Sequence, residues 1–185
     1  MKITKVETMM KTPFISLEKR TYIDTQGDEK EWYMVSRNGG TKAVVIVACK
    51  EATDTEERKI VVTKEFRVPL GDYEWGLPAG LIDEGEDVED TVRRELKEET
   101  GLDVSYVERV SPFIYSTAGL TDESVSMAYV HVEGEPSKEF LEASEDIETF
   151  LMTSEEVAEL LSNEDLKFGA KAWMAFDYFA RTNEI

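Results

Sequence analysis

The chain is organised around the stretch from Gly80 to Leu102. It begins Gly80-Leu-Ile-Asp-Glu-Gly-Glu86 and ends Arg94-Glu95-Leu96-Lys97-Glu98-Glu99-Thr100-Gly101-Leu102. The segment from about Asp87 to Thr100 contains no Gly or Pro, which predicts a helix. Gly101 then stands where a left-handed helix cap favours glycine. The charged residues of this stretch are therefore expected on one helix at fixed offsets.

The predicted helix turns carboxylates toward its inward face. At roughly 100° per residue, Val88, Val92 and Glu99 project to one side, and Glu95 lies beside them. Buried carboxylates are costly, and a helix C-terminus disfavours negative charge. Arg94 supplies one positive charge, whereas a hard divalent cation takes oxygen ligands and binds phosphates. The alternative, a solvated acidic helix with Glu–Lys pairs, is disfavoured by the glycine and the offsets.

The fixed positions of this stretch resemble a complete Nudix box, G-x5-E-x7-R-E-U-x-E-E-x-G-U, where U is an aliphatic residue. They are Gly80, Glu86, Arg94, Glu95, Leu96, Glu98, Glu99, Gly101 and Leu102. A looser resemblance runs from about Val44 to Met152. It implies an α/β fold, the Nudix-type α/β/α sandwich, in which a mixed sheet is flanked by the box helix and C-terminal helices. We expect a small N-terminal β extension over 1–40 that mediates dimerisation, and a hydrolase domain over 41–185.

The resemblance also implies roles for the box residues. Mg²⁺, or Mn²⁺ in its place, would be held by the Ala79 carbonyl and by the carboxylates of Glu95, Glu98 and Glu99. The catalytic residues would be Glu98, Arg94 and the loop residue Glu123. Gly80, Glu86 and Gly101 would shape the box, and Glu86 and Arg94 would brace it. The bound ion would neutralise a diphosphate and acidify a water molecule.

Residues outside the box resemble the ADP-ribose pyrophosphatase branch. Arg67 closes a predicted strand where that branch contacts substrate, although an exposed strand-end arginine is the alternative. The segment from Ser116 to Glu123 resembles the S-P-G-x-x-x-E loop, with Gly119 and Glu123 matching and Ala118 replacing the proline. Glu123 is the candidate general base, because loop closure can bring a carboxylate to the attacking water.

The segment before the box shows one departure and one fixed turn. Pro78 precedes the glycine turn and sets the direction of the Ala79 carbonyl. Many relatives have an acidic residue where this chain has Gly76, so the chain departs from the family at this local contact.

The first forty residues predict strands and turns. A hairpin is expected between Ile15–Ile23 and 31–35, and Asn38-Gly39-Gly40 marks a turn and a boundary. Trp32 lies in this hairpin. It is interpreted either as a core or dimer-interface residue or as a stacking surface for a nucleobase.

The C-terminal part predicts two helices. Thr153-Ser154-Glu155-Glu156 forms a capping box, and a second helix is expected over about 166–180. The aromatic residues of that helix are expected to pack against the sheet. His131, the only histidine, lies in a predicted strand and is given no catalytic role.

The composition limits the partners of the protein. Its 185 residues carry a net charge of -19 at pH 7. Such a chain repels nucleic-acid backbones and anionic membranes, so we expect neither as a partner. We find no apolar core of a signal peptide and no apolar run near the ~20 residues that cross a bilayer, and expect a cytoplasmic protein. The one cysteine, Cys49, lies in an apolar run and predicts a buried thiol.

Together these features predict a metal-dependent hydrolase of a nucleoside diphosphate linked to a second moiety. ADP-ribose, giving AMP and ribose 5-phosphate, is the leading substrate. The alternatives are another nucleotide sugar such as GDP-mannose, or a module that senses ADP-ribose without cleaving it. The complete set of box carboxylates disfavours the sensor.

Overall fold

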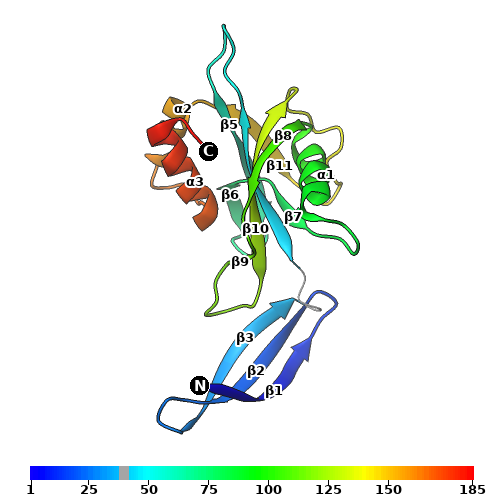
Figure 1. The fold of residues 1–185 in the computed structure, drawn as a ribbon, viewed down its shortest axis with the longest axis vertical. Helices are drawn as coiled ribbons and strands as arrows, with labels where there is room; N and C mark the ends of the chain where they lie inside the picture. Colours follow the sequence, from blue (N-terminus) through cyan, green and yellow to red (C-terminus); the bar gives the residue numbers. More distant parts are fainter. Residues whose placement is uncertain (38–41) are drawn as a thin grey trace. The chain divides into compact units, whose positions relative to one another are not determined.

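The computed structural model describes residues 1–37 and 42–185, which form two compact units (Figure 1). The N-terminal unit comprises Met1–Ala43 and Phe113–Val125, and the box unit comprises Val44–Pro112 and Ser126–Ile185. The predicted turn 38–40 and the predicted boundary between residues 40 and 41 lie outside the described residues. The N-terminal unit thus takes one segment from the middle of the chain.

The N-terminal unit is built on an antiparallel sheet. Strands β1 (Lys2–Lys11), β2 (Ile15–Ile23) and β3 (Glu29–Arg37) lie in the order β1-β2-β3. The predicted hairpin is confirmed as β2 and β3, which pair from Ile15↔Arg37 to Ile23↔Glu29. The inserted segment follows the edge of β3, where the Val35 N–H donates to the Leu120 carbonyl at 2.9 Å.

The larger sheet lies mostly in the box unit. Its central order is β11-β5-β4-β10-β8, with β6 beside β5, β7 beside β4 and β9 beside β10. The strands are β4 (Ala43–Lys50), β5 (Lys59–Arg67), β6 (Asp72–Gly76), β7 (Ala79–Leu81), β8 (Asp103–Val110), β9 (Ile114–Tyr115), β10 (Ser124–Glu133) and β11 (Ile147–Met152). The apolar run of β4 is buried on both sides of the sheet, as its sequence predicts.

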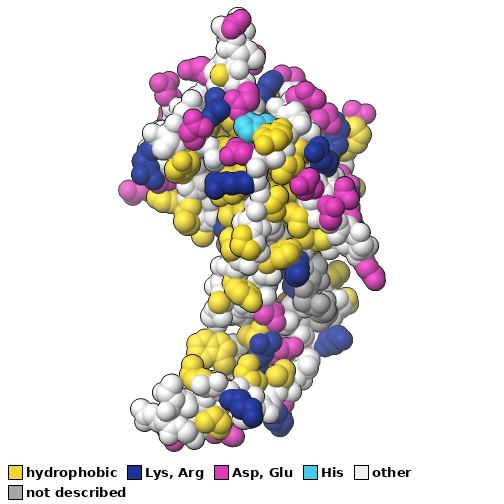
Figure 2. Space-filling view, viewed as in Figure 1, with side chains coloured by type: hydrophobic (Ala, Val, Ile, Leu, Met, Phe, Trp, Pro, Cys, Tyr) yellow, Lys and Arg dark blue, Asp and Glu magenta, His cyan; other side chains and the backbone are white. Residues whose placement is uncertain are grey.

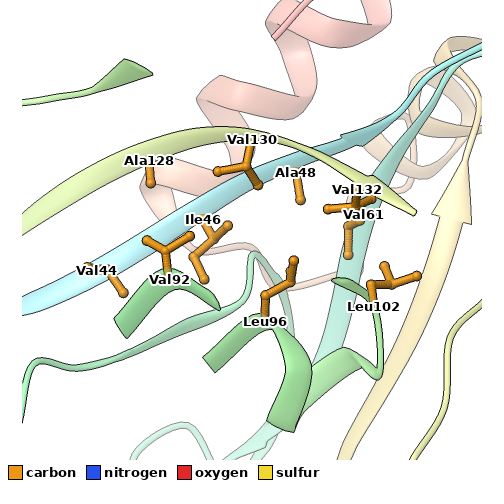
Figure 3. Close-up of a cluster of buried hydrophobic side chains, with 10 residues drawn as sticks. All are labelled: Val44, Ile46, Ala48, Val61, Val92, Leu96, Leu102, Ala128, Val130 and Val132. Atoms are coloured by element: carbon orange, nitrogen blue, oxygen red, sulfur yellow. The ribbon is translucent and has the colours of Figure 1, made fainter. Parts of the chain in front are cut away.

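Helices cover both faces of this sheet (Figure 1). Helix α1 (Val88–Thr100) lies on one face, and α2 (Ser154–Leu161) and α3 (Ala170–Thr182) lie on the other. Between α1 and the sheet, Val92 and Leu96 meet β4 side chains such as Ile46 in the cluster of Figure 3. On the opposite face, Phe176 and Phe179 of α3 are fully buried. The α/β sandwich expected from the sequence is confirmed.

The C-terminal helices differ in part from the prediction. The capping box of α2 is confirmed, because Thr153 and Glu156 exchange both side-chain-to-backbone hydrogen bonds. Helix α3 begins at Ala170 and not near residue 166. The preceding segment pairs with β6 instead, since the Trp75 N–H donates to the Lys167 carbonyl at 2.7 Å. The expectation that every aromatic of α3 packs on the sheet is wrong for Trp173 and Tyr178, which are 45% and 47% exposed.

The surface of the box unit carries many acidic side chains with basic ones between them (Figure 2). Across residues 1–37 and 42–185, no helix is both long and apolar enough to cross a membrane. Cys49 is fully buried, as predicted, and burial raises the pKa of its thiol to about 12.

Candidate functional site

Helix α1 has the ends that the sequence predicts. The Asp87 carboxylate caps its first turn by accepting from the Asp90 N–H at 2.9 Å. Gly101 ends it in the left-handed conformation, with φ of 76°, and its N–H donates to the Lys97 carbonyl. Glycine is needed at 101 for a second reason, because a Cβ there would lie 2.6 Å from the Cβ of Ser137. The loop after β10 therefore passes directly over the end of α1.

Gly80 is required by the position of a carboxylate. A Cβ at this residue would lie 1.8 Å from Cδ of Glu95, a distance that no side chain can occupy. Glycine on β7 thus leaves the space into which α1 sends the Glu95 carboxylate.

Arg94 connects the carboxylates of the box. Its Nε and Nη2 donate to the two carboxylate oxygens of Glu86, both at 2.9 Å. Its Nη1 donates to Glu95 at 2.9 Å and to Glu98 at 3.0 Å. The hydrogen bond from Arg94, helped by one from Thr91, lowers the pKa of Glu86 to about 2. Arg94 therefore fixes the positions of three acidic side chains relative to one another.

Glu99 has a different environment. It is only 8% exposed, and its Oε2 accepts from the Ala79 N–H at 3.1 Å. Burial raises the pKa of this carboxyl to about 9, and burial also raises the pKa of Glu95. In the folded protein the neutral form of Glu99 is therefore favoured unless a cation compensates its charge.

A pocket of about 340 Å³ lies beside these groups. It is lined by Ala79, Gly80, Leu81, Asp83, Arg94, Glu95, Glu98, Glu142 and Glu145. We call it the carboxylate pocket. In the described part of the chain, no three His, Cys, Asp or Glu side chains converge closely enough to hold an ion without rearrangement. The donors nevertheless fit a hard divalent cation, because they are carboxylate oxygens, and those of Glu95, Glu98 and Glu145 belong to partly buried residues.

Glu142 and Glu145 were not singled out by the sequence. They come from the loop between β10 and β11, and burial raises the pKa of Glu145. The three-residue spacing of Glu139, Glu142 and Glu145 is a signal for an acidic loop. It does not say that this loop folds over α1.

Arg67 lies at the end of β5 between two carboxylates. Its Nε donates to Glu74 at 3.1 Å, and its Nη1 donates to Glu65 at 2.8 Å. Its side chain is 43% exposed and lines a second pocket that also includes Ala79. The structure therefore places Arg67 next to a residue of the carboxylate pocket.

The remaining predicted residues lie together in the N-terminal unit. Trp32 is 50% exposed, and its indole N–H donates to the Gly119 carbonyl at 3.1 Å. The Glu123 carboxylate forms an ion pair with Arg37, a residue that the sequence did not single out. The inserted loop thus holds both the edge of Trp32 and the candidate base.

Comparisons with known proteins agree with this geometry. Residues 41–174 match the model of the NUDIX domain. The chain is 34% identical over 124 residues to the ADP-ribose pyrophosphatase of Saccharomyces cerevisiae, covering 65% of this chain and 53% of that protein. It is 34% identical over 128 residues to the ADP-ribose pyrophosphatase of Bacillus subtilis, covering 67% and 66%. The chain therefore spans between half and two thirds of the length of these relatives.

A solved structure shows the same fold. The crystal structure of an ADP compounds hydrolase superposes with a TM-score of 0.75 at 20% identity, covering 98% of this chain and 95% of the other. The motif at 80–102, the helix that it forms and the match over 41–174 lead to one conclusion: the chain belongs to the NUDIX domain family.

Proposed function

We propose that the protein hydrolyses the diphosphate bond of a nucleoside diphosphate linked to a second moiety, with ADP-ribose as substrate and AMP and ribose 5-phosphate as products. The observation that carries this proposal is the arrangement of Glu95 and Glu98 in one pocket beside the buried Glu99. The names of the yeast and Bacillus relatives support ADP-ribose as the substrate.

We propose that the Ala79 carbonyl and the carboxylates of Glu95, Glu98 and Glu99 hold Mg²⁺, with Mn²⁺ as the alternative. When bound, the ion would neutralise diphosphate charge and lower the pKa of a bound water molecule. Arg94 keeps Glu95 and Glu98 in place by its hydrogen bonds to both. Deprotonation of Glu99 would complete the ligand set, since only the ionised carboxylate is a strong ligand.

Arg67 and Trp32 are proposed to bind the substrate. The Arg67 guanidinium is partly exposed and suits a phosphate, which it can bind in a bidentate manner. Half of Trp32 is exposed, so its ring face is available for stacking on a nucleobase. The hydrogen bond from its indole N–H to the Gly119 carbonyl already orders the ring, so binding would cost little further side-chain entropy.

Two carboxylates compete for the role of general base. Glu123 is the residue expected from the loop motif, and its ion pair with Arg37 would have to open before it accepted a proton. Glu145 lines the carboxylate pocket, and burial raises the pKa of its carboxyl, which makes the carboxylate a stronger base. Comparing the pH–rate profiles of Glu123→Gln and Glu145→Gln assigns the role. The variant that loses the ascending limb identifies the base.

Dimerisation through the N-terminal strands and a cytoplasmic location remain proposals. The exposed apolar side chains of β1, among them Val6, Met9 and Met10, support pairing with a second copy. A second candidate substrate class, other nucleotide sugars such as GDP-mannose, is favoured by Ala118, where the chain departs from the S-P-G-x-x-x-E loop of the ADP-ribose pyrophosphatases.

The test is product analysis with a panel of ADP-ribose, GDP-mannose and related nucleotide sugars with Mg²⁺ in ¹⁸O-labelled water. We expect AMP and ribose 5-phosphate from ADP-ribose, with the label in one product reporting the phosphorus attacked. Equal or faster cleavage of GDP-mannose would overturn ADP-ribose as the substrate. Tight binding of ADP-ribose without cleavage would favour the sensor.

A further inference from the structure

The loop between β10 and β11 carries two residues of the carboxylate pocket, Glu142 and Glu145. These two residues form a turn, in which the Glu145 N–H donates to the Glu142 carbonyl at 3.0 Å. Before the turn, the loop is tied to α1, because the Ser137 N–H donates to the Thr100 carbonyl at 2.9 Å. The place of Glu145 in the pocket therefore depends on what holds the loop after the turn.

Asp146 holds the loop after the turn. Its carbonyl accepts from the Phe66 N–H of β5 at 3.1 Å, directly before β11 begins. Its carboxylate Oδ2 accepts from the Tyr73 hydroxyl of β6 at 2.5 Å. Two neighbouring strands thus bind the backbone and the side chain of the residue that follows Glu145.

The ring of Tyr73 is ordered by its own neighbours. Tyr73 pairs with Phe66 across β5 and β6, and the two rings meet edge to face with their centroids 5.5 Å apart. The Lys64 Nζ lies 4.7 Å from the centroid of the Tyr73 ring. Because these contacts fix the ring, its hydroxyl can hold Asp146 at little further cost in side-chain entropy.

The hydrogen bond from Tyr73 also separates acidic charges. Asp146 is the third acidic residue within positions 142–146, after Glu142 and Glu145. Like charges repel, so a donor on β6 keeps the Asp146 carboxylate away from the two that line the pocket. The same hydrogen bond raises the pKa of Tyr73 above its ordinary value of 10, so the hydroxyl keeps its proton and continues to donate at neutral pH.

We propose that Tyr73 is a positioning residue: through its hydrogen bond to Asp146, it keeps the carboxylate of Glu145 where it can accept a proton from the attacking water. The inference rests on the proposed function, with Glu145 as its general base. Tyr73 is not among the described residues that line the carboxylate pocket or the second pocket at Arg67. It therefore acts through the loop and not by touching the substrate.

The test is a double-mutant cycle on the Mg²⁺-dependent hydrolysis of ADP-ribose, combining Tyr73→Phe with Glu145→Gln. We expect Tyr73→Phe to lower kcat about tenfold and to leave KM unchanged, because a displaced base slows proton transfer without weakening binding. In the Glu145→Gln background, the same substitution should have no further effect. Tyr106→Phe is the matched control. It removes the same hydroxyl from a tyrosine that is 59% exposed on β8, and it should retain full activity.

Two substitutions of Asp146 test the hydrogen bond itself. Asp146→Asn keeps an oxygen that can accept from Tyr73 and should retain most of kcat, whereas Asp146→Ala should lose as much as Tyr73→Phe. Hydrogen–deuterium exchange gives a readout that does not depend on turnover. The amides of 137–146 should exchange faster in Tyr73→Phe than in the wild type, and at the wild-type rate in Tyr106→Phe.

An equal loss from Tyr73→Phe in both backgrounds would mean that Tyr73 only stabilises the fold, and it would overturn the inference. Full activity of either Tyr73→Phe or Glu145→Gln, or unchanged exchange of the loop amides, would also overturn it. A wild type that hydrolyses no nucleotide sugar would refute the proposed reaction. An active wild type with an unaffected Tyr73→Phe would refute this inference alone.

Discussion

The two ends of the box contain carboxylates in opposite environments. Before α1, Glu86 is held by Arg94 and Thr91, and the pKa of its carboxyl falls to about 2. In the last turn of α1, Glu99 is buried and accepts from a backbone N–H, and its pKa rises to about 9. The chain neutralises the first carboxylate with its own arginine. For the second, the described contacts include no basic side chain, and the proposed cation would supply the missing positive charge.

The largest effect is expected for Glu99→Gln. Removal of a proposed ligand should reduce the Mg²⁺-dependent turnover of ADP-ribose by about 10²–10³-fold, with the circular dichroism spectrum unchanged. Glu89→Gln, at an exposed position in the first turn of the same helix, is the control and should retain full activity. Near-normal turnover of Glu99→Gln would remove Glu99 from the ligand set.

A smaller effect is expected for Glu86→Gln, because Glu86 acts through Arg94. Loss of an orienting partner should reduce turnover by about tenfold to a hundredfold. The Mg²⁺ concentration at half-maximal rate should stay close to that of the wild type, since Glu95, Glu98 and Glu99 remain. If Glu86→Gln raised the Mg²⁺ concentration at half-maximal rate as much as Glu99→Gln does, the carboxylates at the two ends of the box would not differ in their contribution to metal binding.

The stability of the metal-free protein should report the same contrast. The pKa of Glu99 in the folded state lies above its ordinary value of 4.5. The contribution of Glu99 to the free energy of unfolding is therefore present below pH 4.5 and is lost as the pH rises toward 9. Glutamine does not ionise, so the Glu99→Gln variant does not lose this contribution. Its free energy of unfolding should therefore exceed that of the wild type by an amount that grows across this pH range to a few kcal/mol. Urea denaturation in EDTA measures it.

Glu86 should show the reverse dependence. Its pKa in the folded state is depressed. The contribution of Glu86 to the free energy of unfolding is therefore present above pH 4.5 and is lost as the pH falls toward 2. The difference between the wild type and Glu86→Gln should therefore shrink in acid. A difference that is constant with pH for both variants would contradict the assigned environments.

The smallest effect concerns Cys49. Burial suppresses its charged form, as it does for Glu99, but Cys49 lies in the apolar cluster on the α3 side of the sheet. The native thiol should not react with Ellman's reagent at pH 8, and one thiol should react in urea. Cys49→Ala should leave turnover unchanged. Reaction of the native thiol on mixing would show that this face of the sheet is open.

The sequence was sufficient where chemistry is local. The ends of α1 follow from Asp87 and Gly101, and two of the three residues that the spacing turns inward, Val92 and Glu99, are buried. The apolar run in β4 predicts a strand with two buried faces for a similarly direct reason.

The sequence was insufficient where distant segments decide the structure. Glu142 and Glu145 reach the carboxylate pocket because their loop is tied to the end of α1, where the Ser137 N–H donates to the Thr100 carbonyl. The late start of α3 depends on pairing with β6. Neither contact is indicated by the residues that neighbour it in the sequence. The same holds for the Arg37–Glu123 ion pair, which joins residues 86 positions apart.

The most direct test is a crystal structure with Mn²⁺ and a non-hydrolysable analogue of ADP-ribose, in which anomalous scattering locates the ion. We predict an anomalous peak among the carboxylates of Glu95, Glu98 and Glu99 and the Ala79 carbonyl, in contact with the diphosphate. A bound analogue with the ion elsewhere, and Glu99 still bound only to the Ala79 N–H, would contradict the account.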